Sequence, residues 1–510
     1  MSKTIYPKIS GIFDYVVEVS GKYPYFQNQV FKLDSNEELN LILISATEGK
    51  AYLLAEGKVG DFLVGQSVIP FTSEDKIQTS LRYFGKIIDI KGQVLFPANV
   101  KDSDIKLSYT SLAFNKPNDL LSYQPLEQQL NTGYMSIDLL IPIGKGQREL
   151  IIGDRKTGKT FLALNTIINQ KNKNVKCIYV GIGKQQADIA SVYKTLYDND
   201  ALDYTIIINA SAEQPYDQYL APYIAMAHAE NLSHDNDVLI VFDDLTSHAN
   251  IYREIALLTN KPVGKEAFPG DMFFAHARLL ERSGKFKGRK SITALPILQS
   301  VENDITSLVA SNDISITDGQ IVMNTDLFAQ GKLPAIDIDL SVSRIGGAVQ
   351  KPYIAKVSGK ISKIYKAYKR QIKLASLKYD LNDETSSLLK NGSLVEQMFI
   401  QKGVSIYSES IMFLTAKLIS WGILQNVTNI PKGLKFIEEL CEQNEIAKDT
   451  LNRMLNNLPY DDKMAKEFFA FALAQYASYK NLDWKVNTTQ QFIALDERML
   501  KSIDHKIGDK

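Results

Sequence analysis

The sequence has little of several features that would define a function class. It contains two cysteines, Cys177 and Cys441, which cannot build a disulfide framework and fit a reducing compartment. The longest apolar run, around residues 39–46, is too short to cross a bilayer, and residues 1–13 lack the apolar core of a signal peptide. Neither sign of charge is in excess, since 58 basic residues balance 58 acidic ones, which disfavours a nucleic-acid partner. We therefore expect a soluble, cytoplasmic protein that would reach a membrane only through partners.

The length predicts about three domains. In residues 1–82, short strand-like runs at 15–19, 41–44, 51–54 and 62–64 are separated by glycine turns, which favours a small β-barrel; an irregular β-rich cap is the alternative. Strand-like and helical runs alternate from 83 to 362, a pattern typical of a parallel sheet covered by helices. Helical spacing dominates from 363 to 510, for example at 404–424, 433–441 and 464–479.

The most specific motif is residues 153–160, which match the phosphate-loop pattern G-x-x-x-x-G-K-T. An apolar run precedes the motif and a helical pattern follows it, as a strand–loop–helix requires. Backbone N–H groups of such a loop close around phosphate oxygens, Lys159 supplies a positive charge for the β- and γ-phosphates, and the Thr160 hydroxyl suits Mg²⁺. A chance glycine-rich turn is the alternative. We predict that ATP or ADP and Mg²⁺ are bound by Gly153, Asp154, Arg155, Lys156, Thr157, Gly158, Lys159, Thr160 and Phe161.

A second candidate is Asp243, which ends the apolar run 238–242. A buried strand that ends in a carboxylate is typical of phosphate-loop proteins, where this group holds hydrated Mg²⁺. We therefore predict that Asp243 acts on the metal through water, together with Thr160. Asp244 is expected to point the other way. A strand that ends in Asp for turn reasons is the alternative.

A third candidate is Arg344, which follows the alternating run 336–343. Ligands gather at the carboxyl ends of strands in open α/β sheets, so an arginine there is placed to meet an anion. From spacing alone, a salt bridge with Asp337 or Asp339 is the preferred interpretation.

Several further motifs give residues 124–350 a dense resemblance to the alpha subunit of the F-type ATP synthase. The matching segments are 128–130, Thr132-Gly133-Tyr134, 141–155, Asp243-Asp244-Leu245, Pro269-Gly270-Asp271, 278–282, Ala294-Leu295-Pro296, 315–321 and 340–344. The expected fold is multidomain α/β, with an N-terminal β-barrel (1–82), a central P-loop NTPase (RecA-like) parallel sheet with helices (83–362) and a C-terminal helical domain (363–510).

The resemblance implies a hexameric ring in which this chain alternates with a catalytic beta-type subunit around a central-stalk-type subunit. Such a chain binds Mg-ATP without hydrolysing it. By the motif match, Arg344 falls on the arginine finger that the family supplies in trans to the neighbouring catalytic site. The resemblance thus replaces the salt-bridge interpretation of Arg344.

The sequence departs from the family after the strand-like run 177–180, at Lys184. Catalytic relatives have there a Glu that polarises the attacking water, and typical alpha subunits have Gln. A lysine, with an ordinary pKa of about 10.4, cannot take a proton from water. We therefore expect tight nucleotide binding and poor turnover; a solvent-pointing Lys184 is the alternative.

Departures also occur at the expected base pocket. Lys156 stands where the family usually has Gln, and Leu333 precedes Pro334 where the family has Arg. Of a later glutamine pair, Gln401 is present and Gly403 stands at the second place. Pro334 and Gln401 remain the expected contacts to the base, with adenine selection less secure than phosphate binding. Together with weak matching in residues 1–82 and 400–510, this predicts a divergent paralogue.

Two other functions share this core. A self-sufficient hexameric ATPase of the protein-export type would need a carboxylate base near the γ-phosphate, which Lys184 opposes. A ring-shaped RNA translocase would need a basic, aromatic-bearing surface, which the balanced charge disfavours.

Overall fold

The computed structural model describes residues 6–57, 60–71, 76–97, 104–375 and 383–508. Contacts divide the chain into two compact units. One comprises residues 1–132 and 143–348, and the other comprises residues 133–142 and 349–510. The division into three domains at residues 82 and 362 stays a prediction.

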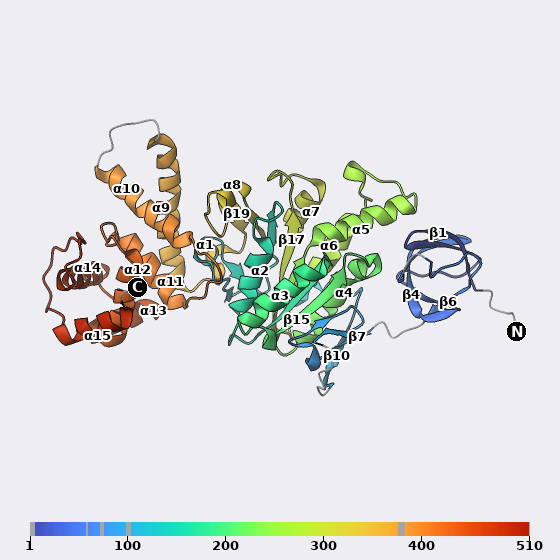
Figure 1. The fold of residues 1–510 in the computed structure, drawn as a ribbon, viewed down its shortest axis with the longest axis horizontal. Coiled ribbons are helices and arrows are strands. Elements are labelled where there is room, and N and C mark those ends of the chain that lie inside the picture. The colour runs from blue at the N-terminus through green and yellow to red at the C-terminus, as the bar shows by residue number, and fades with distance from the viewer. Residues whose placement is uncertain (1–5, 58–59, 72–75, 98–103, 376–382, 509–510) are drawn as a thin grey trace. The chain divides into compact units, whose positions relative to one another are not determined.

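The N-terminal strands form an antiparallel sheet with the order β1-β2-β5-β4-β3-β6. Backbone bonds from Ile9 N to Gln66 O (2.9 Å) and from Val68 N to Pro7 O (2.9 Å) join the first strand to the last. The sheet therefore closes into the predicted barrel (Figure 1), around a core that includes Phe31. The strands are β1 (Lys8–Phe13), β2 (Val16–Ser20), β3 (Val30–Leu33), β4 (Asn36–Thr47), β5 (Lys50–Ala55) and β6 (Val68–Phe71).

The strand expected at residues 62–64 is wrong. Phe62 is buried in the barrel core, but Leu63 and Val64 are 63% and 65% exposed and lead into a turn at Gly65, whose φ is +96°. Three apolar residues in a row therefore do not form a strand here, because the backbone turns before it can pair.

The centre of the first unit is a nine-stranded sheet with the order β19-β18-β13-β17-β16-β14-β15-β8-β9. Its seven inner strands run parallel, and the edge strands β19 and β9 are antiparallel to their neighbours. The strands are β8 (Ile87–Ile88), β9 (Val94–Phe96), β13 (Leu150–Gly153), β14 (Val175–Lys184), β15 (Thr205–Ser211), β16 (Asp237–Asp243), β17 (Ile292–Gln299), β18 (Gly319–Met323) and β19 (Ile336–Ser343). The inner strands are nearly continuous apolar runs, as burial on both faces requires.

Helices connect these strands (Figure 1). They are α2 (Lys159–Ile168), α3 (Gln186–Asp198), α4 (Pro215–Leu232), α5 (Leu245–Leu258), α6 (Met272–Leu280), α7 (Leu308–Ile316) and α8 (Thr325–Ala329). Two short strand pairs complete the unit: β7 (Lys76–Ser80) with β10 (Lys106–Leu112), and β11 (Gln129–Leu130) with β12 (Ile143–Gly144). The expected α/β sheet is confirmed.

The direction of β19 decides which end of the sheet each of its termini reaches. Gly153, at the end of β13, lies beside Met323 of the parallel strand β18. Met323 is paired with Ile336, the first residue of β19, whereas Gly319 is paired with Ser343, the last. The start of β19 is therefore level with the phosphate loop, and its end is at the opposite end of the sheet.

The second unit is helical, as expected. Its helices are α1 (Met135–Leu140), α9 (Pro352–Ala375), α10 (Asp383–Phe399), α11 (Glu409–Trp421), α12 (Ile430–Gln443), α13 (Glu445–Leu455), α14 (Asp462–Tyr479) and α15 (Glu497–Ile507). Among the described residues, no helix combines the length and apolarity that a membrane span needs.

Candidate nucleotide site and the arginine at the opposite end of the sheet

The phosphate loop connects β13 to α2, in the predicted order of strand, loop and helix. Gly158 has a φ of +96° and Lys156 a φ of +65°, so the loop turns through the left-handed region twice. A Cβ on Gly153 would lie 2.6 Å from the main-chain oxygen of Met323, which explains why a glycine is needed there. The N–H groups that begin α2 are left without helical acceptors and form the anion-binding end of the loop.

Lys159 folds back over its own loop. Its ammonium group donates to the main-chain oxygens of Gly153 (2.8 Å) and Asp154 (2.6 Å). Its pKa is lowered to about 8, chiefly by burial and also by the positive charge of Lys184, against the opposing attraction of Asp244 and Asp243. A bound phosphate group would give this buried ammonium a negatively charged partner in place of neutral main-chain oxygens.

The side chain of Asp154 anchors the loop to the protein. Its carboxylate accepts from Ser300 Oγ (2.6 Å), from the backbone N–H of Asn303 (3.0 Å) and from Thr325 Oγ1 (3.2 Å). Partial burial raises its pKa, but these bonds outweigh that effect and hold the pKa below its usual range. The predicted contact of Asp154 with nucleotide therefore concerns its backbone.

The other predicted loop residues differ in exposure. Thr157 is buried and donates through Oγ1 to the main-chain oxygen of Asp154 (2.8 Å). Arg155 and Lys156 are exposed, and Phe161, in the first turn of α2, is 37% exposed. A ligand bound at the loop could therefore contact these three exposed side chains.

Thr160 and Asp243 lie together, as predicted for a magnesium site. The Thr160 hydroxyl donates to Asp243 Oδ2 (2.6 Å), and the Tyr179 hydroxyl donates to the same oxygen (2.8 Å). Asp243 ends β16, and its side chain is 1% exposed. Sequence reasoning missed Tyr179; the only signal was a polar-tipped aromatic residue inside an apolar strand neighbouring β16.

The other oxygen of Asp243 is held by Lys184. The ammonium lies 2.6 Å from Asp243 Oδ1 and 3.3 Å from Asp244 Oδ2. Burial acts to lower the pKa of Lys184, but the attraction of Asp243 and Asp244 outweighs it and raises the pKa. The solvent-pointing alternative for Lys184 is therefore wrong.

The expectation that Asp244 points away from this site is also wrong. Asp244 Oδ1 caps helix α5 by accepting from the backbone N–H of Ser247 (2.8 Å), while Oδ2 faces Lys184. The strand ends at Asp243, so the strict alternation of side chains no longer applies at the next residue.

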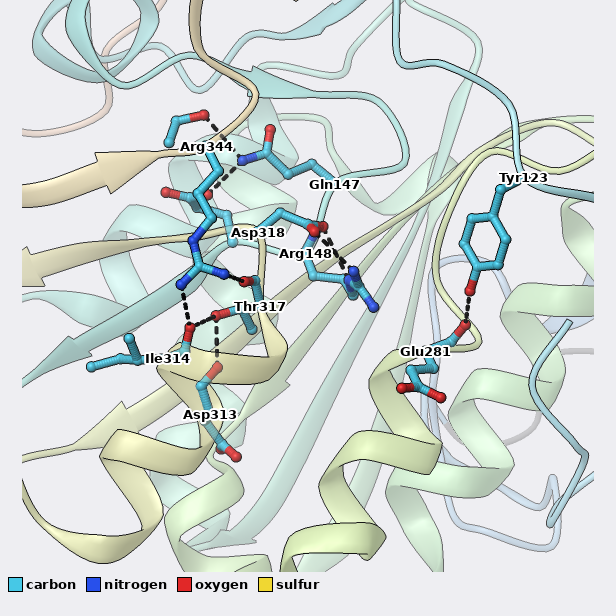
Figure 2. A network of polar contacts seen from close by, with 11 residues as sticks. Tyr123, Gln147, Arg148, Glu281, Asp313, Ile314, Thr317, Asp318 and Arg344 are labelled. Atoms are coloured by element: carbon cyan, nitrogen blue, oxygen red, sulfur yellow. Dashed lines mark hydrogen bonds and ion pairs between the residues drawn. The ribbon is translucent and has the colours of Figure 1, made fainter. Parts of the chain in front are cut away.

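Arg344 follows the last residue of β19, at the end of the sheet opposite to the phosphate loop. Figure 2 shows its guanidinium directed at the end of α7, where it donates to the main-chain oxygens of Thr317 (3.0 Å) and Ile314 (3.1 Å). Carbonyl groups at a helix C-terminus carry partial negative charge and attract a cation. The reason first given for Arg344, that strand ends gather at the ligand edge, is wrong because β19 is antiparallel.

The residues around Arg344 keep this corner in place (Figure 2). The backbone N–H of Arg344 donates to the main-chain oxygen of Asp318 (2.9 Å). The carboxylate of Asp318 accepts from Arg148 Nε (3.0 Å) and Nη2 (2.8 Å). The guanidinium of Arg344 is thus held by main-chain oxygens and not by the salt bridge with Asp337 or Asp339 that spacing alone favoured.

The predicted base contacts lie in different units. Pro334 precedes β19 and therefore lies at the phosphate-loop end of the sheet. Gln401 belongs to the second unit, where its amide accepts from Met135 N (2.7 Å) and donates to Gly133 O (3.1 Å). A role of Pro334, Gln401 or Lys156 at the base stays a prediction.

Comparisons with known proteins extend over almost the whole chain. Residues 133–343 match the model of the ATP synthase alpha/beta family, nucleotide-binding domain, and residues 350–475 match the ATP synthase alpha/beta chain, C terminal domain. The chain is 42% identical to ATP synthase subunit alpha 2 of Mycoplasmopsis pulmonis, over 98% of this chain and 99% of that one. It is 38% identical to ATP synthase subunit alpha of Mycoplasma capricolum (89% and 92%) and 37% identical to ATP synthase subunit alpha 1 of M. pulmonis (87% and 82%).

Proposed function

This chain belongs to the ATP synthase alpha/beta family, as an alpha-type subunit of the F-type enzyme, and from that premise we propose a division of labour between the two ends of its sheet. One end binds ATP or ADP, with Mg²⁺, and does not hydrolyse it. The other end supplies Arg344 to the catalytic site of a neighbouring subunit. The self-sufficient ATPase of the protein-export type is not favoured.

The observation that carries this proposal is the antiparallel direction of β19. It separates Arg344 from the chain's own phosphate loop by the length of the parallel strands, since Ser343 pairs with Gly319 and Gly153 with Met323. An arginine finger must touch the phosphates on which it acts. Arg344 is therefore suited to a nucleotide held by another chain.

Absence of turnover at the chain's own site follows from Lys184. A hydrolytic site needs a group that can accept a proton from water. Lys184 is a cation whose raised pKa opposes proton release, and it occupies both nearby carboxylates, Asp243 and Asp244. The site can thus hold a triphosphate without activating water.

The residues present fit Mg²⁺ in the way that a phosphate-loop site requires. The Thr160 hydroxyl uses its proton on Asp243, which leaves its oxygen lone pairs free for a cation, and Asp243 can accept from the metal's water. Among the described residues, no group of three acidic, histidine or cysteine side chains could hold a metal alone, so phosphate oxygens would complete the shell. The metal, when bound, neutralises phosphate charge.

The partners proposed for this chain follow from family membership. They are a catalytic beta-type subunit that alternates with it in a hexameric ring and a central-stalk-type subunit. The chain would then be cytoplasmic and reach a membrane indirectly. We also propose a divergent paralogue, which is supported by its higher identity to the alpha 2 subunit of M. pulmonis than to the alpha 1 subunit.

The test is to purify the full chain and measure ATP binding and ATP hydrolysis, alone and after reconstitution with its beta-type partner. We expect binding without turnover by the chain alone and turnover by the ring. Substantial hydrolysis by the isolated chain would contradict the proposal and support the export-type alternative.

A further inference from the structure

Lys184 lies beside the two carboxylates of the nucleotide site, where a phosphate-loop protein needs positive charge to hold a phosphate group. Its ammonium contacts one oxygen of Asp243 (2.6 Å), while Thr160 donates to the other oxygen (2.6 Å). The side chain of Lys184 is 20% exposed and that of Asp244 is 13% exposed, so water screens this cluster weakly. One buried carboxylate thus joins the ammonium directly to the hydroxyl of the phosphate loop.

Charge balance explains what this contact does. Asp243 and Asp244 together carry two negative charges beside the place where a triphosphate would lie, and they would repel it. In phosphate-loop sites a divalent cation removes this repulsion by lying between carboxylate and phosphate. Here the ammonium of Lys184 already neutralises part of that charge before any metal arrives.

We propose that Lys184 supplies, as a fixed cation, part of the positive charge that Mg²⁺ brings to such a site, so that this chain binds nucleoside di- and triphosphates when the metal is withheld. The inference rests on the proposed function, because it concerns the same nucleotide site. It goes beyond that function by making the metal dispensable for binding. Held nucleotide would then stay in place when free Mg²⁺ falls.

The position of Lys184 in the sheet makes this cation a fixed part of the site. β14 and β16 run parallel with Gly181 beside Asp243, so the last residue of β14 reaches past the end of β16. Burial and two carboxylate partners hold the ammonium at that edge. A free monovalent cation would have to be captured from solution at an entropic cost, whereas this one is already bound to the chain.

The experiment measures equilibrium binding of ATP and ADP to the full chain, with excess Mg²⁺ and with EDTA. It compares wild type with K184Q, K184R and K194Q; Lys194 is an exposed lysine on α3 and serves as the matched control for lost charge. We expect the wild-type Kd to differ by less than about tenfold between the two conditions. In K184Q, metal-free binding should weaken by roughly ten- to hundredfold more than binding with Mg²⁺ does, which is the range for a lost charged hydrogen bond.

Each outcome decides the inference. Metal-free binding that is retained in wild type, K184R and K194Q but lost in K184Q supports it. Wild-type binding that vanishes in EDTA overturns the inference and leaves the proposed function intact, whereas absence of binding in both conditions overturns both. An equal response of wild type and K184Q to EDTA also overturns it. If K184Q does not fold, as judged by circular dichroism, the wild-type comparison decides.

Discussion

The two ends of the central sheet differ in how their charged groups are held. At the phosphate-loop end, Lys159 and Lys184 are largely buried: Lys184 is paired with the buried Asp243, and Lys159 donates to main-chain oxygens of its own loop. At the opposite end, Arg344 is exposed and its guanidinium donates to two main-chain oxygens. Two buried ammonium groups beside one paired carboxylate are suited to retaining an anionic ligand, whereas an exposed guanidinium held by neutral carbonyl oxygens can leave them for an anion. One sheet can therefore serve its own ligand and a neighbour's reaction.

The largest expected effect comes from Arg344→Ala. Loss of a finger supplied in trans should lower turnover of the reconstituted ring by roughly 10³–10⁵-fold. ATP binding by the isolated chain should be unchanged, because Arg344 lies at the other end of the sheet from the phosphate loop. ATPase assays of the ring and equilibrium binding by the chain measure the two ends separately. Unchanged ring activity would refute the finger role, and Arg344→Lys tests whether charge without the planar fork suffices.

Lys159→Ala tests the phosphate-loop end, and it should affect nucleotide binding more than turnover of the ring. We expect ATP binding by the isolated chain to weaken by roughly ten- to hundredfold, because a charged donor to phosphate is lost. Most of the ring's turnover should remain. Lys194→Ala is the matched control, since Lys194 is an exposed lysine on α3, outside the loop. A loss of turnover as complete as that of Arg344→Ala would mean that this site is itself catalytic.

Asp154→Ala tests whether the phosphate-loop end is held rigid by the protein. The change removes the acceptor for Ser300, Asn303 and Thr325. We expect unfolding free energy to fall by roughly 1–3 kcal/mol and ATP binding to weaken, while the Arg344 end keeps its role. Denaturant unfolding and binding measure this. Asp154→Asn retains one acceptor oxygen and should lie between wild type and the alanine variant; identical behaviour of all three would contradict an anchoring role.

The last expected effect does not distinguish the two ends, because it comes from a buried histidine of the sheet's covering helix α4. His228 of α4 is buried, its Nδ1 lies 2.8 Å from Thr79 Oγ1, and burial lowers its pKa from 6.5 to about 4. The unfolded chain therefore binds a proton that the folded chain does not. The contribution of His228 to stability should be complete above about pH 6.5 and fall by roughly 1.4 kcal/mol per pH unit towards pH 4. Denaturant unfolding at several pH values measures this as the difference in slope between wild type and His228→Gln; equal slopes would contradict the assignment.

Much of the phosphate-loop end could be predicted because its signals are local. The strand, the loop and the helix at 150–168 are contiguous, and the motif's spacing follows from how a backbone wraps a phosphate. Asp243 was predictable because it ends an apolar run. The roles of Tyr179 and Asp154 were harder to predict. Tyr179 looks like an ordinary aromatic residue in a strand, and the residues that donate to the Asp154 carboxylate lie in distant segments of the chain.

By itself, the sequence determined the parts that depend on neighbours along the chain: the loop with Lys159 and Thr160, the buried strands and the family motifs. The tertiary structure alone decided the direction of β19 and the contact of Lys184 with Asp244, which is 60 positions away. An edge strand has the same alternating pattern whether it runs parallel or antiparallel. Which end of the sheet receives Arg344 is therefore set by hydrogen-bond pairing with β18, and pairing leaves no mark on the strand's own residues.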